Sequence, residues 1–190
     1  MTRITKPPEE RRQEIIDTAM KVFYEKGYEK TSISDIAREM HVAQGLCYRY
    51  FSSKEELFDT ALDQYAMLQV QRLCANMRQD MSLSELAANA PSFLETENDD
   101  SYAEKFYHDS GNAKFHWQLS LKVCEKLQPI VADFLRAAIA RGEIRLADPD
   151  TAASFFVYGQ LGILLDHTLP AQERVMRVRR FLSDVLKNFC

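Results

Sequence analysis

The sequence predicts an all-α fold, with a small helical head at the N-terminus followed by a larger helical domain. Apolar residues recur mainly three and four positions apart, which is the spacing of one helix face. No convincing run alternates between apolar and polar residues as a β-strand does, and the 190 residues include only six glycines and six prolines. Because 46% of the residues are apolar, the chain can fill a hydrophobic core.

Charge is distributed unevenly along the chain. Residues 1–54 hold ten Lys and Arg against eight Asp and Glu, whereas residues 55–190 hold fourteen against twenty. The overall net charge of −4 argues weakly against nucleic-acid binding, but its distribution would direct a polyanion to the first part. We therefore expect two domains, residues 1–54 and residues 55–190, with different tasks.

Capping residues and helix breakers delimit the helices of the first domain. A helix is expected to begin at the pair of prolines near residue 7 and to end at Gly27. A second helix follows Ser32, because Ser-Ile-Ser-Asp has the capping-box pattern with Asp in place of Glu or Gln. A third is expected over residues 43–50, and a fourth from Ser53 to about Arg78. The second and third helices, with a short turn between them, describe a helix-turn-helix unit.

The second domain is expected to be helical throughout. Residues 82–112 predict shorter helices with a mobile connection. A long helix should follow over residues 113–140, with a kink or a break at Pro129. An Asp-Pro pair begins the next helix, expected over residues 148–166, and Pro170 begins the last.

A group of residues at fixed spacing stands out between residues 27 and 57, in the stretch GYEKTSISDIAREMHVAQGLCYRYFSSKEEL. The positions concerned are Gly27, Thr31, Ser32, Ile36, Ala37, Val42, Gly45, Tyr48, Tyr50, Phe51, Lys54 and Leu57. With the preceding helix RRQEIIDTAMKVFYEKG, this stretch resembles the TetR/AcrR family of bacterial transcriptional regulators, over about the first third of the chain. The resemblance implies a repressor that binds a palindromic double-stranded DNA operator as a homodimer and is released by a small-molecule inducer.

The resemblance places the third helix in the major groove and its flanks on phosphates. Base reading is expected of Gln44, Leu46 and Arg49, because Gln can pair with adenine, Arg with guanine, and Leu can contact a thymine methyl group. Phosphate contacts are expected of Ser32, Ser34, Tyr48, Tyr50 and Lys54.

Two residues of the third helix leave alternatives open. Gly45 would let the helix backbone approach DNA, or would let the helix pack closely on a neighbour. Cys47 could make DNA binding sensitive to oxidation, but a role as a small buried hydrophobe is favoured, since buried apolar thiols react poorly. The family commonly has Ser or Thr, a basic residue, Thr, and Leu or Ile at the positions of Ala43, Gln44, Leu46 and Cys47, so the operator sequence is not predictable.

The resemblance also implies an effector site in the middle helices and a dimer contact in the last two helices. The expected effector-binding residues are Tyr102, Phe106, Tyr107, Phe115, His116, Trp117 and Cys124. An aromatic cluster at helical spacing is more often plain core, and this alternative stays open. The expected dimer-interface residues are Phe155, Gly159, Gly162, Val178, Leu182 and Val185.

Other function classes receive less support. The sequence has no GxSxG, P-loop, HExxH or GxGxxG motif, so we do not expect an enzyme. Four dispersed cysteines form no CxxC pair, and we expect neither a metal nor a cofactor. A regulator of the same fold controlled by a protein partner or by thiol oxidation remains the alternative. The lack of an apolar span or signal segment predicts a cytoplasmic protein without membrane contact.

Overall fold

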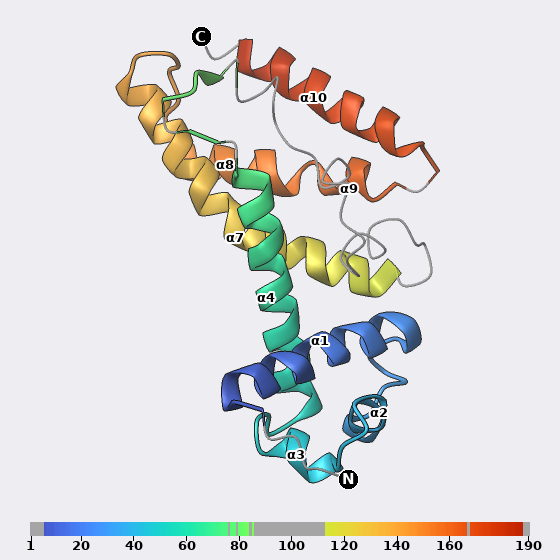
Figure 1. Ribbon diagram of the computed structural model, residues 1–190. Helices are drawn as coiled ribbons and strands as arrows, with labels where there is room; N and C mark the ends of the chain where they lie inside the picture. Colours follow the sequence, from blue (N-terminus) through green and yellow to red (C-terminus); the bar gives the residue numbers. More distant parts are fainter. Residues whose placement is uncertain are drawn as a thin grey trace. The chain divides into compact units, whose positions relative to one another are not determined.

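The structure, a computed structural model, describes residues 6–75, 77–78, 80–83, 85, 113–166 and 168–187. Within these ranges all regular secondary structure is helical, which confirms the all-α prediction (Figure 1). The chain divides into a first compact unit, Met1–Tyr65 with Gly111–Phe115, and a second, Ala66–Ser110 with His116–Cys190. The predicted domain boundary after residue 54 stays a prediction, because the helix that begins there belongs to both units.

The helices of the first unit begin where the capping signals place them. Helix α1 spans Pro8–Lys26, α2 spans Ile33–Glu39 and α3 spans Gln44–Tyr48. Helix α4 spans Lys54–Cys74 and leaves the first unit after Tyr65. Two ends differ from the prediction, since α3 stops at Tyr48 and α4 at Cys74. At α3 the difference concerns only the last turn, because the N–H groups of Arg49 and Tyr50 still donate to carbonyls of α3.

Two local motifs set the ends of α2. At its start, the Ser32 Oγ accepts from the Asp35 N–H at 3.2 Å, and the Asp35 carboxylate accepts from the Ser32 N–H at 3.0 Å. This confirms the capping box with Asp in third place. At its end, His41 adopts the left-handed conformation with φ of 55°, and the Val42 N–H donates to the Ala37 carbonyl at 2.9 Å. This is a Schellman motif with a histidine where glycine is usual.

The second unit contains a long helix, two shorter ones and a final amphipathic helix. Helix α7 spans Ala113–Ala140 and enters this unit after Phe115. Helix α8 spans Pro149–Tyr158, α9 spans Leu161–Leu164 and α10 spans Ala171–Lys187. Figure 1 shows α7 as one continuous helix that bends along its length. A break at Pro129 is therefore wrong, and of the two expectations the kink agrees with the structure.

The single helix expected over residues 148–166 is a second error. Helix α8 ends at Tyr158, and a turn at Gly159 and Gln160 separates it from α9. Glycine is less favourable than Ala inside a helix by about 1 kcal/mol. Gly159 and Gly162 therefore make an interruption of the helix at this point less costly. The expectation for residues 82–112 lies almost wholly outside the described residues.

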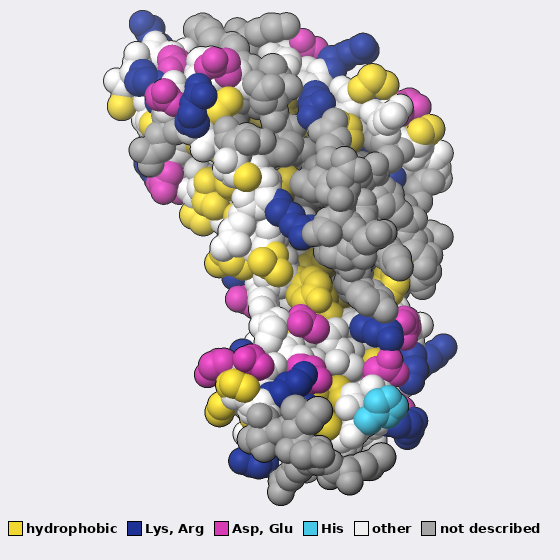
Figure 2. Space-filling view, in the orientation of Figure 1, with side chains coloured by type: hydrophobic (Ala, Val, Ile, Leu, Met, Phe, Trp, Pro, Cys, Tyr) yellow, Lys and Arg dark blue, Asp and Glu magenta, His cyan; other side chains and the backbone are white. Residues whose placement is uncertain are grey.

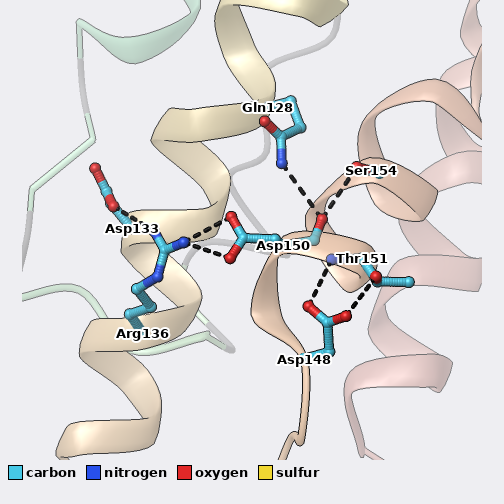
Figure 3. A network of polar contacts seen from close by, with 7 residues as sticks. All are labelled: Gln128, Asp133, Arg136, Asp148, Asp150, Thr151 and Ser154. Atoms are coloured by element: carbon cyan, nitrogen blue, oxygen red, sulfur yellow. Dashed lines mark hydrogen bonds and ion pairs between the residues drawn. The ribbon is translucent and has the colours of Figure 1, made fainter.

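A polar network joins α7 to the start of α8 (Figure 3). The Arg136 guanidinium donates to both carboxylate oxygens of Asp150, at 2.6 and 2.5 Å, and to Asp133 at 2.6 Å. Next to it, the Asp148 carboxylate accepts from the Thr151 N–H at 3.0 Å, which confirms the predicted cap of α8. These side chains are exposed, so the network orients α8 more than it stabilises the fold.

Apolar packing supplies the stability of the second unit. One buried cluster joins the C-terminal half of α7, including Phe134 and Leu135, to Ile144 and Ala153. A second joins Cys124 of α7 to Val157 and Leu161 of α8 and α9. None of the helices in the described part of the chain has the length and apolarity needed to cross a bilayer.

Candidate nucleic-acid interface

One side of helix α3 packs against the core of the first unit, and the other side is exposed to solvent. Cys47 is fully buried, and the next buried side chain, Phe51, lies just beyond the helix. Gln44, Gly45, Tyr48 and Arg49 are all exposed. Because helical residues four apart share a face, the pairs 44 with 48 and 45 with 49 form one continuous exposed strip. We call these four residues the α3 face.

Gly45 lies in the middle of the α3 face. A Cβ atom placed on it would meet no atom of the described residues within 4 Å, and its φ is not in the left-handed region. Neither close packing on a neighbouring helix nor a special backbone conformation therefore explains the glycine. Of the two alternatives that the sequence leaves open, only the approach of an external surface retains support.

The three base-reading candidates differ in exposure. Gln44 and Arg49 are exposed at the two ends of α3, whereas Leu46 is half-buried. The α3 face can thus present an amide and a guanidinium to base edges, which are the groups that pair with adenine and guanine. Leu46 lies to the side of this face, so it has less surface to offer to a thymine methyl group.

Among the phosphate candidates, Tyr48 is 49% exposed, while Tyr50 and Ser34 are half-buried. The Ser32 hydroxyl is already engaged, since it donates to the Asp35 carboxylate at 2.5 Å. These hydrogen bonds from Ser32 hold the pKa of Asp35 below its ordinary value. Ser32 therefore acts first as the cap of α2, and its proton would reach a phosphate only by leaving Asp35.

Lys54 has partners within the chain that the sequence did not reveal. Its Nζ donates to the carbonyl of Tyr28 at 3.0 Å and lies 4.1 Å from the centre of the Tyr28 ring. Tyr28 also packs on Phe58, with ring centres 4.5 Å apart. The ammonium thus ties the start of α4 to the loop between α1 and α2 by a hydrogen bond and a cation–π contact. The only sequence signal for this contact was the aromatic residue directly after Gly27.

On the face shown in Figure 2, charge is mixed rather than gathered. In the view of Figure 2, Lys and Arg side chains are scattered among Asp and Glu side chains. Several basic residues of the first unit are paired with acids, such as Lys21 with Glu39 at 2.6 Å. Non-specific attraction of a polyanion is weak in such a field, so specific contacts of the α3 face would have to supply much of the affinity.

The thiols are poorly suited to rapid oxidation. Burial raises the pKa of Cys47 and of Cys74, and it raises the pKa of Cys124 to about 12. The thiolate is the reactive form, so these three cysteines react slowly. The packing role of Cys47 gains support, and the redox alternative gains none.

The structure describes four of the seven predicted effector residues, and all four lie on α7. Phe115 belongs to the first unit, where its ring packs against Phe58 with centres 6.1 Å apart. In the second unit His116 and Cys124 are buried, while Trp117 is 46% exposed. Tyr102, Phe106 and Tyr107 lie outside the described residues.

Sequence reasoning missed two buried polar residues of the second unit, Gln69 and Ser120. The sequence signal for both residues is a polar side chain at a position on the apolar stripe of a helix. Among the described residues, no cluster of three or more His, Cys, Asp or Glu side chains could hold a metal ion.

The dimer candidates also divide into two groups. Phe155 is 76% exposed, and Gly159 and Gly162 are also exposed. On α10, Val178 is buried within the chain, and Leu182 and Val185 are half-buried. The exposed apolar residues of α10 are instead Met176 and Phe181, each 62% exposed, which the sequence prediction missed.

Short helices joined by a capped turn, with one polar face left open, define the first unit as a helix-turn-helix domain. Residues 15–61 match the family model of the bacterial regulatory proteins of the tetR family. The HTH-type transcriptional regulator YuxN of Bacillus subtilis (strain 168) is 45% identical over 56 residues, which are 30% of this chain and 19% of that protein. HbdR of Aromatoleum sp. (strain CIB), also named an HTH-type transcriptional regulator, is 51% identical over 49 residues, 26% and 21% of the two chains. The chain therefore spans about a fifth of the length of these curated relatives.

The likeness in fold extends beyond the head. A crystal structure of a TetR-family transcriptional regulator from Pectobacterium atrosepticum covers 97% of this chain and 97% of its own, with a TM-score of 0.65 and 20% identity. At this identity the likeness concerns the fold. Residues 15–61 are thus similar to the tetR family of bacterial regulatory proteins, and the fold of the whole chain resembles that of solved TetR-family regulators.

Proposed function

We propose that the protein binds a palindromic double-stranded DNA operator as a homodimer and represses transcription until a small molecule releases it. The α3 face carries the proposal, because it combines exposed Gln44, Tyr48 and Arg49 with a glycine that no neighbour requires. Set in the major groove, Gln44 and Arg49 would face base edges, and the Tyr48 hydroxyl would face a phosphate. The site of action is the cytoplasm, where bacterial DNA lies.

Lys54 supports this binding mode indirectly. The Lys54 ammonium uses one of its three N–H groups on Tyr28, so the others can still point to a phosphate. Its contact with Tyr28 fixes the start of α4 close behind the helix-turn-helix unit. A positioned ammonium loses less entropy on contact with DNA than a free one, which favours binding.

A dimer follows from the half-site geometry and from exposed apolar surface. Helix-turn-helix dimers bind half-sites about 34 to 36 Å apart, one turn of DNA. Phe155 on α8 and Met176 and Phe181 on α10 are exposed to an extent that is unfavourable in a monomer. Gly162 is exposed, and a Cβ atom on it would meet nothing within 4 Å among the described residues, so a partner helix can come close there, whereas Gly159 is needed because a Cβ atom would meet the Phe155 carbonyl oxygen at 2.4 Å. We place the interface on these three helices.

The test is binding of the purified protein to DNA from upstream of its own gene, followed by fluorescence anisotropy at two salt concentrations. Arg49→Ala should weaken specific binding by about 1 to 3 kcal/mol, which is the value of a good base contact. Arg145→Ala, at an exposed position of the second unit, is the matched control and should leave binding unchanged. Equal affinity of the wild type and Arg49→Ala for specific DNA would count against the proposed interface.

A further inference from the structure

Gln69 is a buried amide without a complete set of partners. It lies on α4 in the second unit and is 3% exposed, and its Oε1 has no hydrogen-bond partner among the described residues. The positions that share its side of the helix are apolar and buried, as Ala66, Val70 and Leu73 show. A carbonyl oxygen in such surroundings loses its hydration and gains nothing in return, which is unfavourable for the free protein.

The nearby sequence offers no structural reason for this amide. Leu or Met would fill the same volume on the apolar stripe of α4 without the penalty of an unpaired oxygen. An unpaired buried acceptor becomes favourable once a donor arrives. In a protein whose proposed function requires an effector, that donor can belong to the effector.

We propose that the Oε1 atom of Gln69 accepts a hydrogen bond from the effector, and that the effector is a neutral, mainly apolar molecule with a hydroxyl or N–H donor. The inference rests on the proposed function, because it names the ligand class of the same regulator. A carboxylate or an ether presents only acceptors to Oε1, so neither satisfies it.

Two other buried polar residues of the second unit, His116 and Ser120, agree with a neutral ligand, whereas the Nε of Arg174 has no hydrogen-bond partner among the described residues and offers a competing site for an acid. His116 and Ser120 are 3% and 4% exposed and lie four residues apart on one side of α7. Within the described residues the one buried cationic side chain is Arg174, whose Nη1 donates to the Leu164 carbonyl. A buried anion requires a cation or several donors, whereas a hydroxyl requires one or two ordinary hydrogen bonds.

The experiment uses ligands matched in their apolar body. Two sets serve as probes, namely 1-naphthol, 1-methoxynaphthalene and 1-naphthoate, and 1-decanol, decyl methyl ether and decanoate. Binding to the full chain is measured by isothermal titration calorimetry and by the shift in melting temperature. The variant is Gln69→Met, which keeps the length of the side chain and removes the acceptor. The control is Gln71→Met, the same substitution at an exposed position of the same helix.

We expect a donor member of at least one set to bind the wild type about tenfold or more tightly than its ether and acid, a ratio that corresponds to about 1.4 kcal/mol. Gln69→Met should lose this preference and, without ligand, should melt about 2 to 4 °C higher than the wild type. Gln71→Met should keep the preference.

Three results would overturn the inference. They are equal binding of alcohol and ether by the wild type, an unchanged preference in Gln69→Met, and no response to any donor probe. Preferred binding of an acid that Arg174→Met abolishes would also overturn it and point to Arg174 instead. Operator binding is measured in parallel. If the protein binds the operator but its ligand preference does not depend on Gln69, the inference fails and the proposed function stands.

Discussion

Replacing Gly45 by Ala adds one methyl group that should affect DNA binding but not folding. In the free protein the new methyl group meets nothing within 4 Å, and the backbone there is compatible with any L-residue. Alanine exceeds glycine in helix propensity by about 0.5 to 1 kcal/mol, so Gly45→Ala should be at least as stable as the wild type. For a chain of this size, that gain corresponds to a rise of about 2 to 4 °C in melting temperature at most.

On DNA the same methyl group would stand between the α3 face and the base edges. A shift of the helix by the thickness of a methyl group would break a base contact of Gln44 or Arg49, worth about 1 to 3 kcal/mol. Specific affinity should therefore fall about tenfold to hundredfold, since 1.4 kcal/mol is about a factor of ten. The assay pairs thermal unfolding with anisotropy titrations against specific and random duplexes.

Gln71→Ala serves as a control, because Gln71 is exposed on α4 in the second unit and the change also favours a helix. It should leave affinity unchanged. Wild-type affinity in Gly45→Ala would refute the close approach of the backbone to DNA. A clear loss of stability in Gly45→Ala would refute the open space around Gly45.

Three further predictions concern the helix-turn-helix unit. His41→Gly should stabilise the protein by about 1 kcal/mol in urea unfolding, because it relieves the left-handed φ of 55°, whereas His41→Ala should not. The pKa of Asp35 is lower in the folded protein than in the unfolded chain, so its ionised form stabilises the fold at neutral pH. This stability is lost as pH falls through the folded-state pKa. The difference in unfolding free energy between the wild type and Asp35→Asn should therefore shrink below about pH 4. Cys47→Ala should lower stability through a small cavity, and peroxide should leave DNA binding unchanged both in this variant and in the wild type. An unaltered urea midpoint in His41→Gly, a constant gap with pH, or a peroxide effect that Cys47→Ala removes would contradict the respective prediction.

Features that depend on a few consecutive residues could be predicted from the sequence. Ser32 and Asp35 form their capping box because side chain and backbone are three residues apart, whatever surrounds them. Gly27 and Asp148 end and begin helices for similarly local reasons. The exposed face of α3 follows from the same logic, since burial of Cys47 on one side leaves the other side open.

Features that depend on residues far apart in the chain could not be predicted. The Lys54 ammonium meets the Tyr28 carbonyl across 26 positions, and an aromatic residue after Gly27 does not by itself indicate which cation it contacts. The end of α8 at Tyr158 was missed because one glycine in a helical pattern is often tolerated. The packing of α10 decides which of its apolar residues stay exposed. The sequence alone therefore placed Val178 at the interface, whereas Val178 is buried and Phe181 is exposed.

The most direct test of the central claim is selection of duplexes from a random pool, carried out with the wild type and with Gln44→Ala and Arg49→Ala. The account predicts that the wild type enriches a palindrome with half-site centres about 10 bp apart, and that each variant relaxes its preference at one position per half-site while still binding. Absence of an enriched palindrome, or a motif that both substitutions leave unchanged, would contradict the assignment of the α3 face to DNA.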